Sequence, residues 1–204
     1  MSSIIICNAE PADIAKVVDI HSVCFKDSFS TSLGRNILFK YYKSYLKYNP
    51  NLFLIAKYDG KIIGFVVGYC CEDNQALVEF KKRNRFKIIF RVLSRMVLFD
   101  KRVYRKIFKK NGDEKIIFPN FDSILKEVKC DLLSICVLPE FRKNKIATKL
   151  ESEFSNVLLF LKRKYCILSC QINNSVANHF YIRQGYIMYK NNNKSNYYIK
   201  EISR

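Results

Sequence analysis

The sequence predicts an α/β (α+β) fold, and three observations point to it. The N-terminal part reads as a strand, two helices and two more strands. Asp59-Gly60, between the last two strands, is a strong hairpin signal. The stretch Asp131–Leu150 reads as an apolar strand that continues through a basic loop into a helix. The 204 residues show neither a linker nor an internal repeat, so one domain spanning 1–204 is expected.

The first elements follow from periodicity and from turn residues. The predicted order is a strand at 3–7, helices at 14–25 and 35–48, and strands at 52–57 and 62–69. Cap residues precede the first helix, and Gly34 and Asn49-Pro50 bound the second. His21 falls on the apolar face of the first helix, where a packed core histidine is expected rather than a ligand.

The C-terminal elements are read in the same way. A helix is predicted from Thr148 to Lys164, a strand at 165–172, and a helix at 175–184 that Gly185 terminates. Two strands, at 186–189 and 197–199, close the chain around a polar turn.

Charge is the unusual part of the composition. The chain has 36 Lys and Arg against 18 Asp and Glu, a formal net charge of +18. A field of this sign favours an anionic partner such as a nucleotide, phosphate, nucleic acid or an anionic membrane surface.

The cysteines indicate neither a metal site nor a secreted scaffold. Eight are present without a CxxC pair, and two histidines are too few to complete a zinc set, so no metal is expected. Most lie in strand or helix patterns, where a free cysteine behaves as a small hydrophobe. Neither a signal-peptide pattern nor an apolar run of membrane-spanning length appears. We therefore expect a reducing, cytoplasmic compartment.

A basic insertion at about 75–128 separates the two halves. Between Lys81 and Lys110 there are thirteen Lys or Arg and one acid, Asp100, with apolar residues at helical spacing. This predicts a basic amphipathic helix, or two that break near Asp100. A solvated basic face is the plainest explanation. A patch on the inner membrane surface and a lid over an anionic substrate stay open as alternatives.

Two motifs resemble those of the GNAT superfamily (GCN5-related N-acetyltransferases). VLPEFRKNKIA at 137–147 is similar to the family's V-x-P-x-x-[RQ]-x-x-G-x-[GA], and NSVANHFYIRQGY at 174–186 is similar to N-x-x-A-x-x-[LF]-Y-x-x-x-G-[FY]. The match covers the chain apart from the insertion. It implies a central mixed, mostly antiparallel sheet that is splayed between its fourth and fifth strands and flanked by helices. The helical insertion would lie between the third and fourth strands.

The resemblance also implies acetyl-CoA as the acyl donor. Its pyrophosphate would lie on the amides at the start of a helix, where N–H groups lack internal partners. Strand residues would pair with the pantetheine, and an asparagine would touch the cofactor near the fifth strand. The implied cofactor-binding residues are Ile135, Cys136, Val137, Arg142, Lys143, Asn144, Lys145, Ile146, Ala147 and Asn174. Lys145 stands where the family has a glycine, so either the loop adopts a conformation open to lysine or the phosphate contact is altered.

The same resemblance implies Tyr181 as the catalytic acid that protonates the departing thiolate, with aromatic packing beside Phe180 as the alternative. A general base is not assigned, because the strand at 165–172 contains no acid. Asp131, Glu72 and Asp73 are the candidates. His179 is discounted, because two residues along a helix it points to a different face from Tyr181.

The expected function is acetyl-CoA-dependent transfer of acetyl to a primary amine. A small anionic acceptor such as a nucleotide-linked amino sugar fits the charge best. One alternative is a protein N-terminal or lysine acetyltransferase. Another is a non-catalytic module that docks on an anionic membrane or nucleic acid through the insertion. For the enzyme, peripheral membrane contact stays open and nucleic acid is the less expected partner.

Overall fold

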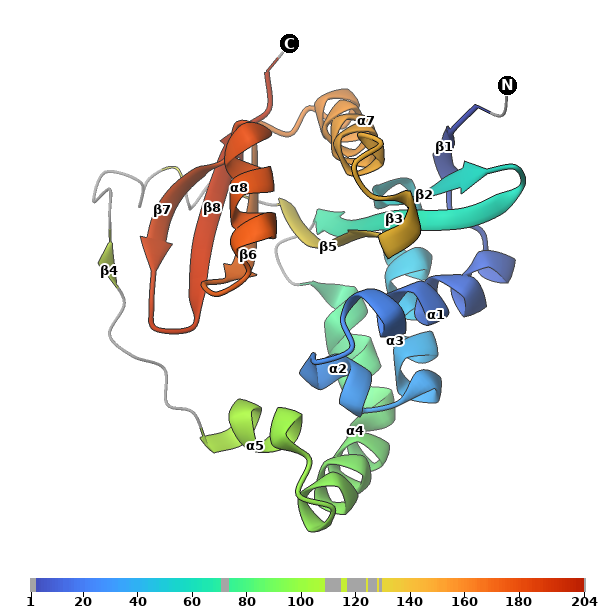
Figure 1. Ribbon diagram of the computed structural model, residues 1–204, viewed down its shortest axis with the longest axis vertical. Coiled ribbons are helices and arrows are strands. Elements are labelled where there is room, and N and C mark those ends of the chain that lie inside the picture. The colour runs from blue at the N-terminus through green and yellow to red at the C-terminus, as the bar shows by residue number, and fades with distance from the viewer. Residues whose placement is uncertain are drawn as a thin grey trace.

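The computed structural model describes residues 3–70, 74–108, 115–116, 124, 128 and 130–203. Across these ranges the strands form one eight-stranded sheet in the order β1-β2-β3-β5-β6-β8-β7-β4. β5 and β6 pair in parallel, whereas the other neighbouring pairs are antiparallel. The predicted mixed, mostly antiparallel sheet with flanking helices is confirmed (Figure 1).

The N-terminal elements follow the predicted order, with one additional short helix, α2 (Phe29–Ser32), that was not predicted. They are β1 (Ile5–Asn8), α1 (Ile14–Cys24), α2, α3 (Arg35–Tyr48), β2 (Phe53–Tyr58) and β3 (Lys61–Cys70). Asp59 and Gly60 have φ angles of 49° and 70°, as a two-residue hairpin turn requires. His21 is buried, with Nδ1 2.6 Å from the Tyr42 hydroxyl oxygen, and burial lowers its pKa to about 4. It is a neutral core histidine, as expected.

The C-terminal elements build the other half of the sheet. They are β5 (Cys130–Val137), α7 (Ile146–Phe160), β6 (Tyr165–Gln171), α8 (Ser175–Arg183), β7 (Ile187–Asn191) and β8 (Ser195–Glu201). The prediction that the first of these helices opens at Thr148 is wrong. α7 begins at Ile146, because Ile146 is buried in the core and the residue before it turns the chain in a left-handed conformation.

The insertion contains two helices, α4 (Gln75–Val97) and α5 (Lys101–Phe108), and a short edge strand, β4 (Lys115–Ile116). The break at Asp100 is confirmed, and its carboxylate accepts hydrogen bonds from the Arg102 N–H and Nε. α4 packs on α3 through a small buried cluster of Leu33, Ile37 and Phe80. Most of the predicted return at 116–129 lies outside the described residues.

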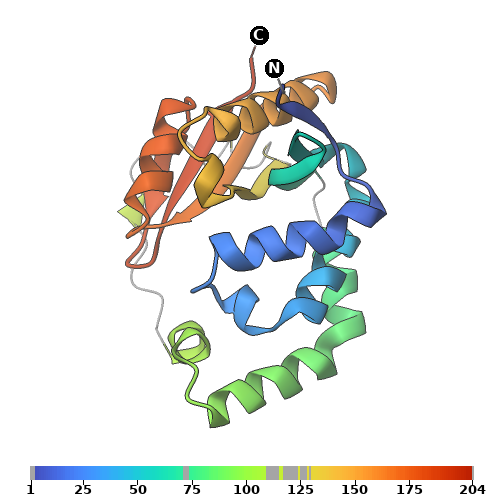
Figure 2. The ribbon, with the colours of Figure 1, turned by 45° about the vertical axis from the view of Figure 1, so that its right-hand side comes forward.

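Apolar side chains cover both faces of the sheet. Phe154 and Leu158 of α7 are fully buried on one face, and Tyr42 and Tyr45 of α3 are fully buried on the other. Figure 2 shows α7 along one side of the sheet and α1 and α3 along the opposite side. Burial of each such side chain contributes about 1.5–3 kcal/mol, so the two layers hold the central strands in place.

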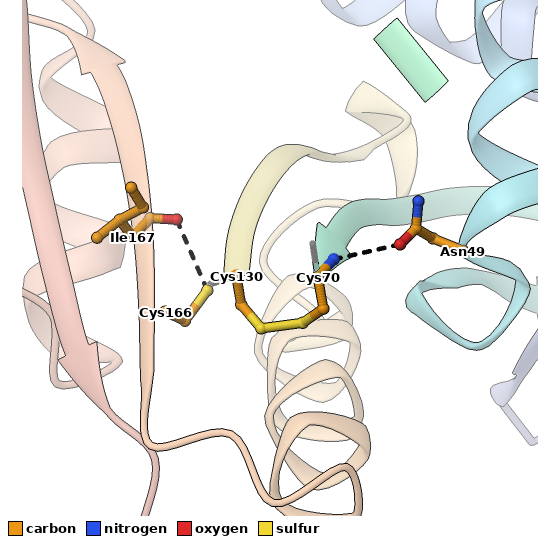
Figure 3. The surroundings of a disulfide bond; sticks show 5 residues. All are labelled: Asn49, Cys70, Cys130, Cys166 and Ile167. Atoms are coloured by element: carbon orange, nitrogen blue, oxygen red, sulfur yellow. Dashed lines mark hydrogen bonds between the residues drawn. A yellow bond between two sulfur atoms is a disulfide. The ribbon is translucent and has the colours of Figure 1, made fainter. Parts of the chain in front are cut away.

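The cysteine prediction is wrong for one pair. Cys70 and Cys130 form a disulfide that joins the ends of β3 and β5, with the Asn49 side chain accepting from the Cys70 N–H (Figure 3). The two residues lie opposite each other in the β3–β5 ladder. Because they are 60 residues apart in the sequence, their pairing could not be predicted from local patterns. The free cysteines in the described ranges are Cys7, Cys24, Cys136, Cys166 and Cys170. Within the same ranges, none of the helices has the length and apolar character needed to cross a bilayer.

Candidate active site

The sheet opens between its two parallel strands. β5 and β6 are paired at one position, where Asp131 lies opposite Ile167. On its other edge β5 pairs with β3 along its whole length, and β6 likewise pairs with β8. Beyond Asp131 the two strands diverge (Figure 1). Peptide groups on the facing edges therefore lack a strand partner there and can pair with a ligand.

A bulge in β5 lies close to this point. The β3–β5 register passes from Val67 opposite Ser134 to Gly68 opposite Leu132, which leaves Leu133 as an extra residue. A Cβ at Gly68 would lie 2.5 Å from the Asp131 carbonyl oxygen and 2.5 Å from the Phe154 ring, so only glycine fits. Bulges bend a strand and redirect its groups, and they are common beside active sites.

The end of β5 is tied to the loop that follows. The Val137 carbonyl accepts from Arg142 Nε at 3.1 Å and from Cys24 Sγ at 3.4 Å. Cys136 is buried, and its side chain together with Arg142 lowers the pKa of the Cys24 thiol to about 7. Sequence reasoning missed Cys24, because it lies on α1, 113 residues from Val137. The three β5 residues predicted to bind the cofactor, Ile135, Cys136 and Val137, lie after the bulge, at the end of the strand.

The loop from Arg142 to Ala147 has the backbone of an anion site. Lys143 and Lys145 have φ angles of 67° and 55°, and both side chains are exposed. Left-handed Lys145 followed by helical Ile146 is a backbone sequence that turns successive N–H groups toward one point. Lys145 therefore occupies the left-handed conformation that glycine adopts easily, so the backbone of the loop keeps the shape expected with glycine at this position.

The charge around this loop is positive. Arg142, Lys143, Lys145 and Lys149 are all exposed, and the first turn of α7 contains no acid. Helix polarity adds to the field, because the first N–H groups of α7 have no intrahelical acceptors. Exposed Asn144 completes the loop, while Ala147 packs partly against the core.

Asn174 begins α8. Its side-chain Oδ1 accepts from the Ala177 N–H at 3.2 Å, which satisfies one of the free N–H groups of the helix. Asn178, in the next turn, is buried; its Nδ2 donates to the Gln171 carbonyl and its Oδ1 accepts from the Tyr198 hydroxyl. α8 is therefore fixed against both β6 and β8.

Tyr181 points from α8 into the core beside the opening. It is 8 % exposed, and its ring lies 5.7 Å from that of Tyr186 and 6.0 Å from that of Tyr198. Burial raises its pKa, and repulsion between its phenolate form and the ionised forms of Cys170, Cys136 and Asp131 raises the pKa further. At pH 7 the hydroxyl is neutral and able to donate a proton, and no hydrogen bond to it is found within the described ranges.

Asp131 is the candidate base that the structure describes. It lies on β5 at the junction with β6, two residues before the bulge. Burial raises the pKa of its carboxyl to about 7, where a general base is effective at neutral pH. Glu72 and Asp73, the other candidates, lie outside the described residues. His179 is exposed whereas Tyr181 is buried, which confirms that the two point to different faces of α8.

A basic cleft of about 830 Å³ opens on the other face of β6. Cys166, Leu168 and Cys170 point into the core, whereas Ser169 and Gln171 alternate with them and line the cleft. α5 and the β7–β8 turn form its walls. Its lining cations are Arg102, Arg105, Lys106 and Lys194, and no carboxylate is among the described residues that line it.

The walls of the cleft are held by polar contacts. Arg102 Nη1 and Arg105 Nη2 donate to the carbonyls of Lys26 and Asp27 at 3.0 and 2.7 Å, which fixes α5 against the segment after α1. In the β7–β8 turn, Asn192 Oδ1 accepts from the N–H groups of Lys194 and Ser195. The insertion therefore contributes one wall of the cleft.

Comparison with known proteins gives a consistent picture. The model of the acetyltransferase (GNAT) family matches residues 14–186. The crystal structure of SsHAT is similar with a TM-score of 0.67 and 17% identity, covering 99% of this chain and 100% of that one. PaiA N-acetyltransferase from Thermoplasma acidophilum in complex with coenzyme A has a TM-score of 0.56 at 16% identity, covering 98% and 99%. The NatC complex bound to Gag peptide and CoA has a TM-score of 0.59 at 14% identity, with the same coverage. No curated protein matches.

Proposed function

The chain belongs to the acetyltransferase (GNAT) family and is an acetyl-CoA-dependent N-acetyltransferase, and from this premise we propose that its acceptor is the primary amine of a small anionic molecule. The observation that carries the proposal is the basic cleft between α5, the end of β6 and the β7–β8 turn. A nucleotide-linked amino sugar has the required chemistry, because it combines an amine with phosphate charges.

The donor side of the site is proposed to hold acetyl-CoA along the loop and strand already described. The amides from Arg142 to Ala147 would receive the pyrophosphate, since they combine a helix start with left-handed turns. The edge of β5 from Ile135 to Val137 would pair with the pantetheine amides. A peptide N–H near the bulge would then polarise the thioester carbonyl.

Donor and acceptor would approach from opposite faces of β6. Tyr181 lies on the face covered by α7 and α8, whereas Ser169 and Gln171 line the cleft on the other face. In this proposal the acceptor amine would pass from the cleft through the opening between β5 and β6 to a thioester held along β5. This geometry suits direct transfer without an acyl-enzyme intermediate.

The proposed chemistry uses two protein groups. The neutral amine nitrogen attacks the thioester carbonyl carbon, and Asp131 accepts the proton that the nitrogen loses. As the C–N bond forms and the C–S bond breaks, the departing thiolate takes a proton from the Tyr181 hydroxyl. The products are the N-acetylated acceptor and free CoA, and exchange with solvent returns the proton from Asp131 to Tyr181.

A protein N-terminal or lysine acceptor is the second candidate. The similarity to the NatC complex favours it, because that structure has a similar fold and is bound to Gag peptide and CoA. Two features of this chain favour the small anion instead. β6 carries no acidic side chain from Tyr165 to Gln171, and α5 adds cations to the acceptor side.

Acceptor class can be tested by following thiol release with amino sugars, nucleotide-linked amino sugars, peptides and polyamines. We expect the nucleotide-linked amino sugar to have the lowest KM, and that KM should rise with ionic strength because the attraction is Coulombic. Lys106→Glu should raise it about tenfold, whereas Lys101→Glu, on the same helix but outside the cleft lining, should not. A KM independent of salt, or equal effects of both variants, would contradict the proposal.

A further inference from the structure

The outward face of α4 is apolar along the C-terminal half of the helix, from Phe86 to Val97. Its large side chains recur at helical spacing and are mostly exposed: Phe86 (72 %), Ile89 (53 %), Phe90 (74 %), Leu93 (56 %) and Val97 (77 %). The helix lies along the edge of the molecule opposite α7 (Figure 2). Single exposed apolar residues are ordinary, but a continuous stripe of this kind marks an interaction surface.

Exposed cations border the stripe. Lys81, Lys82, Arg85 and Lys87 are exposed, and the Arg85 guanidinium lies 4.5 Å from the centre of the Phe86 ring. Long basic side chains beside an apolar face can bury their stems while holding the charge at the level of lipid headgroups.

A cationic groove of about 440 Å³ runs beside the stripe, between α3 and α4. Its cations are Lys40, Lys43, Lys47 and Arg83, and its one lining carboxylate among the described residues, Glu79, is shared by Lys47 and Arg83 at 3.2 and 2.7 Å. Lys87 lies close enough to Lys40 to hold the pKa of that amine below its usual value. Arg83 and Lys87 each precede a phenylalanine of the stripe by three residues, so groove and stripe are adjacent on the helix surface.

We propose that the outward face of α4 docks on an anionic membrane surface. Phe86, Phe90 and Leu93 enter the boundary between headgroups and acyl chains, and the flanking cations and the groove contact lipid phosphates. The helix lies parallel to the membrane plane. This inference does not depend on the identity of the acceptor.

The chemistry of the surface favours lipid over two other occupants. A second copy of the chain would bring two strongly cationic borders together, and like charges repel. Nucleic acid would match the charge and could stack bases on Phe86 and Phe90, but it would leave the exposed aliphatic side chains of Ile89, Leu93 and Val97 without an apolar partner. An apolar stripe with a cationic border is complementary to an anionic bilayer on both counts.

Tryptophan fluorescence gives a direct test, because the chain contains no tryptophan. In a Phe90→Trp variant all tryptophan emission therefore comes from position 90. We expect its emission to shift to shorter wavelength with vesicles of equimolar phosphatidylglycerol and phosphatidylcholine, and far less with phosphatidylcholine alone. Phe160→Trp is the matched control, since Phe160 is 84 % exposed but lies on α7, and its emission should not shift.

Two further changes in the Phe90→Trp background separate the parts of the surface. Lys82→Glu with Arg85→Glu, and separately Phe86→Ser, should each weaken vesicle binding by about tenfold or more. Lys16→Glu with Lys164→Glu, exposed cations away from α4, should change it little. Calorimetric affinity for acetyl-CoA should stay unchanged in every variant, which shows that the fold is intact.

Three outcomes would overturn the proposal. The first is a Phe90→Trp emission that does not respond to anionic vesicles or that responds no more than Phe160→Trp. The second is a shift that appears without lipid as protein concentration rises and that accompanies dimer formation. The third is a response to a mixed-sequence oligonucleotide that equals or exceeds the response to vesicles.

Discussion

The start of α7 and the outward face of α4 are both rich in Lys and Arg, but they present positive charge in different ways. At the start of α7 the backbone supplies the groups that can bind an anion, because left-handed Lys143 and Lys145 turn free N–H groups outward. On α4 the charge lies on side chains around an exposed apolar stripe. Cations with ordered amides suit one compact anion, whereas cations with apolar area suit an extended anionic surface.

The two regions should therefore respond to different changes. Substitutions around β5, α7 and α8 should alter acetyl transfer, and substitutions on α4 should alter docking and leave transfer intact.

Tyr181→Phe should have the largest effect. Loss of the hydroxyl removes the proton donor for the departing thiolate, so kcat should fall by about 10²–10³, with little change in the KM for acetyl-CoA. Steady-state kinetics measures both constants. Tyr186→Phe, in the same aromatic cluster, is the control and should keep most of the activity. Equal activity of Tyr181→Phe and the wild type would remove the acid assignment.

The disulfide joins the end of β3 to the start of β5, on either side of the insertion that contains α4. Replacing both Cys70 and Cys130 with serine should lower the free energy of unfolding by about 2–4 kcal/mol, because the bridge constrains a long loop in the unfolded chain. Urea unfolding measures the difference. A reducing agent should destabilise the wild type by a similar amount and leave the double variant unchanged. Cys7→Ser, at a free cysteine, serves as control.

Asp131→Asn tests the base through pH. With a pKa of about 7, the carboxylate forms as pH rises, so wild-type kcat should increase through pH 7 and level off above it. The variant should lose this rise and fall about tenfold or more at pH 8. An unchanged profile would refute the assignment.

The free energy of unfolding should fall as pH rises through the pKa of Asp131, whereas kcat should rise over the same range. A carboxyl whose folded pKa is raised stabilises the fold while it is protonated, and that contribution is lost as pH rises through 7. The variant should therefore show a smaller loss of stability than the wild type between pH 4 and pH 8 in urea unfolding.

The smallest effect is expected at Lys145. Substitutions there distinguish binding of the pyrophosphate by backbone amides from binding by the lysine side chain. Lys145→Gly keeps the left-handed conformation, whereas Lys145→Val disfavours it, because a β-branched residue rarely adopts positive φ. If the amides hold the pyrophosphate, valine should weaken acetyl-CoA binding about tenfold and glycine only slightly. Calorimetry measures both affinities. Equal losses would assign the binding to the lysine charge instead.

Much of the fold could be predicted because local patterns determine it. The Asp59-Gly60 turn, the break at Asp100 and the limits of α3 follow from turn chemistry and helical periodicity, which act over a few residues. The start of α7 was missed by two residues, because burial of Ile146 and the conformation of Lys145 depend on the packed core. The single-domain organisation and the cytoplasmic location stay predictions.

Local patterns in the sequence predicted the order of the main elements, the excess of positive charge and the motif positions that hold Arg142, Asn174 and Tyr181. Which distant residues meet depends on the packing of the folded chain. This packing pairs Cys70 with Cys130, partly buries Asp131 so that the pKa of its carboxyl rises, and places α5 across the cleft from the end of β6. The physical reason is that periodicity and capping act along the chain, whereas strand register and burial act between segments far apart in it.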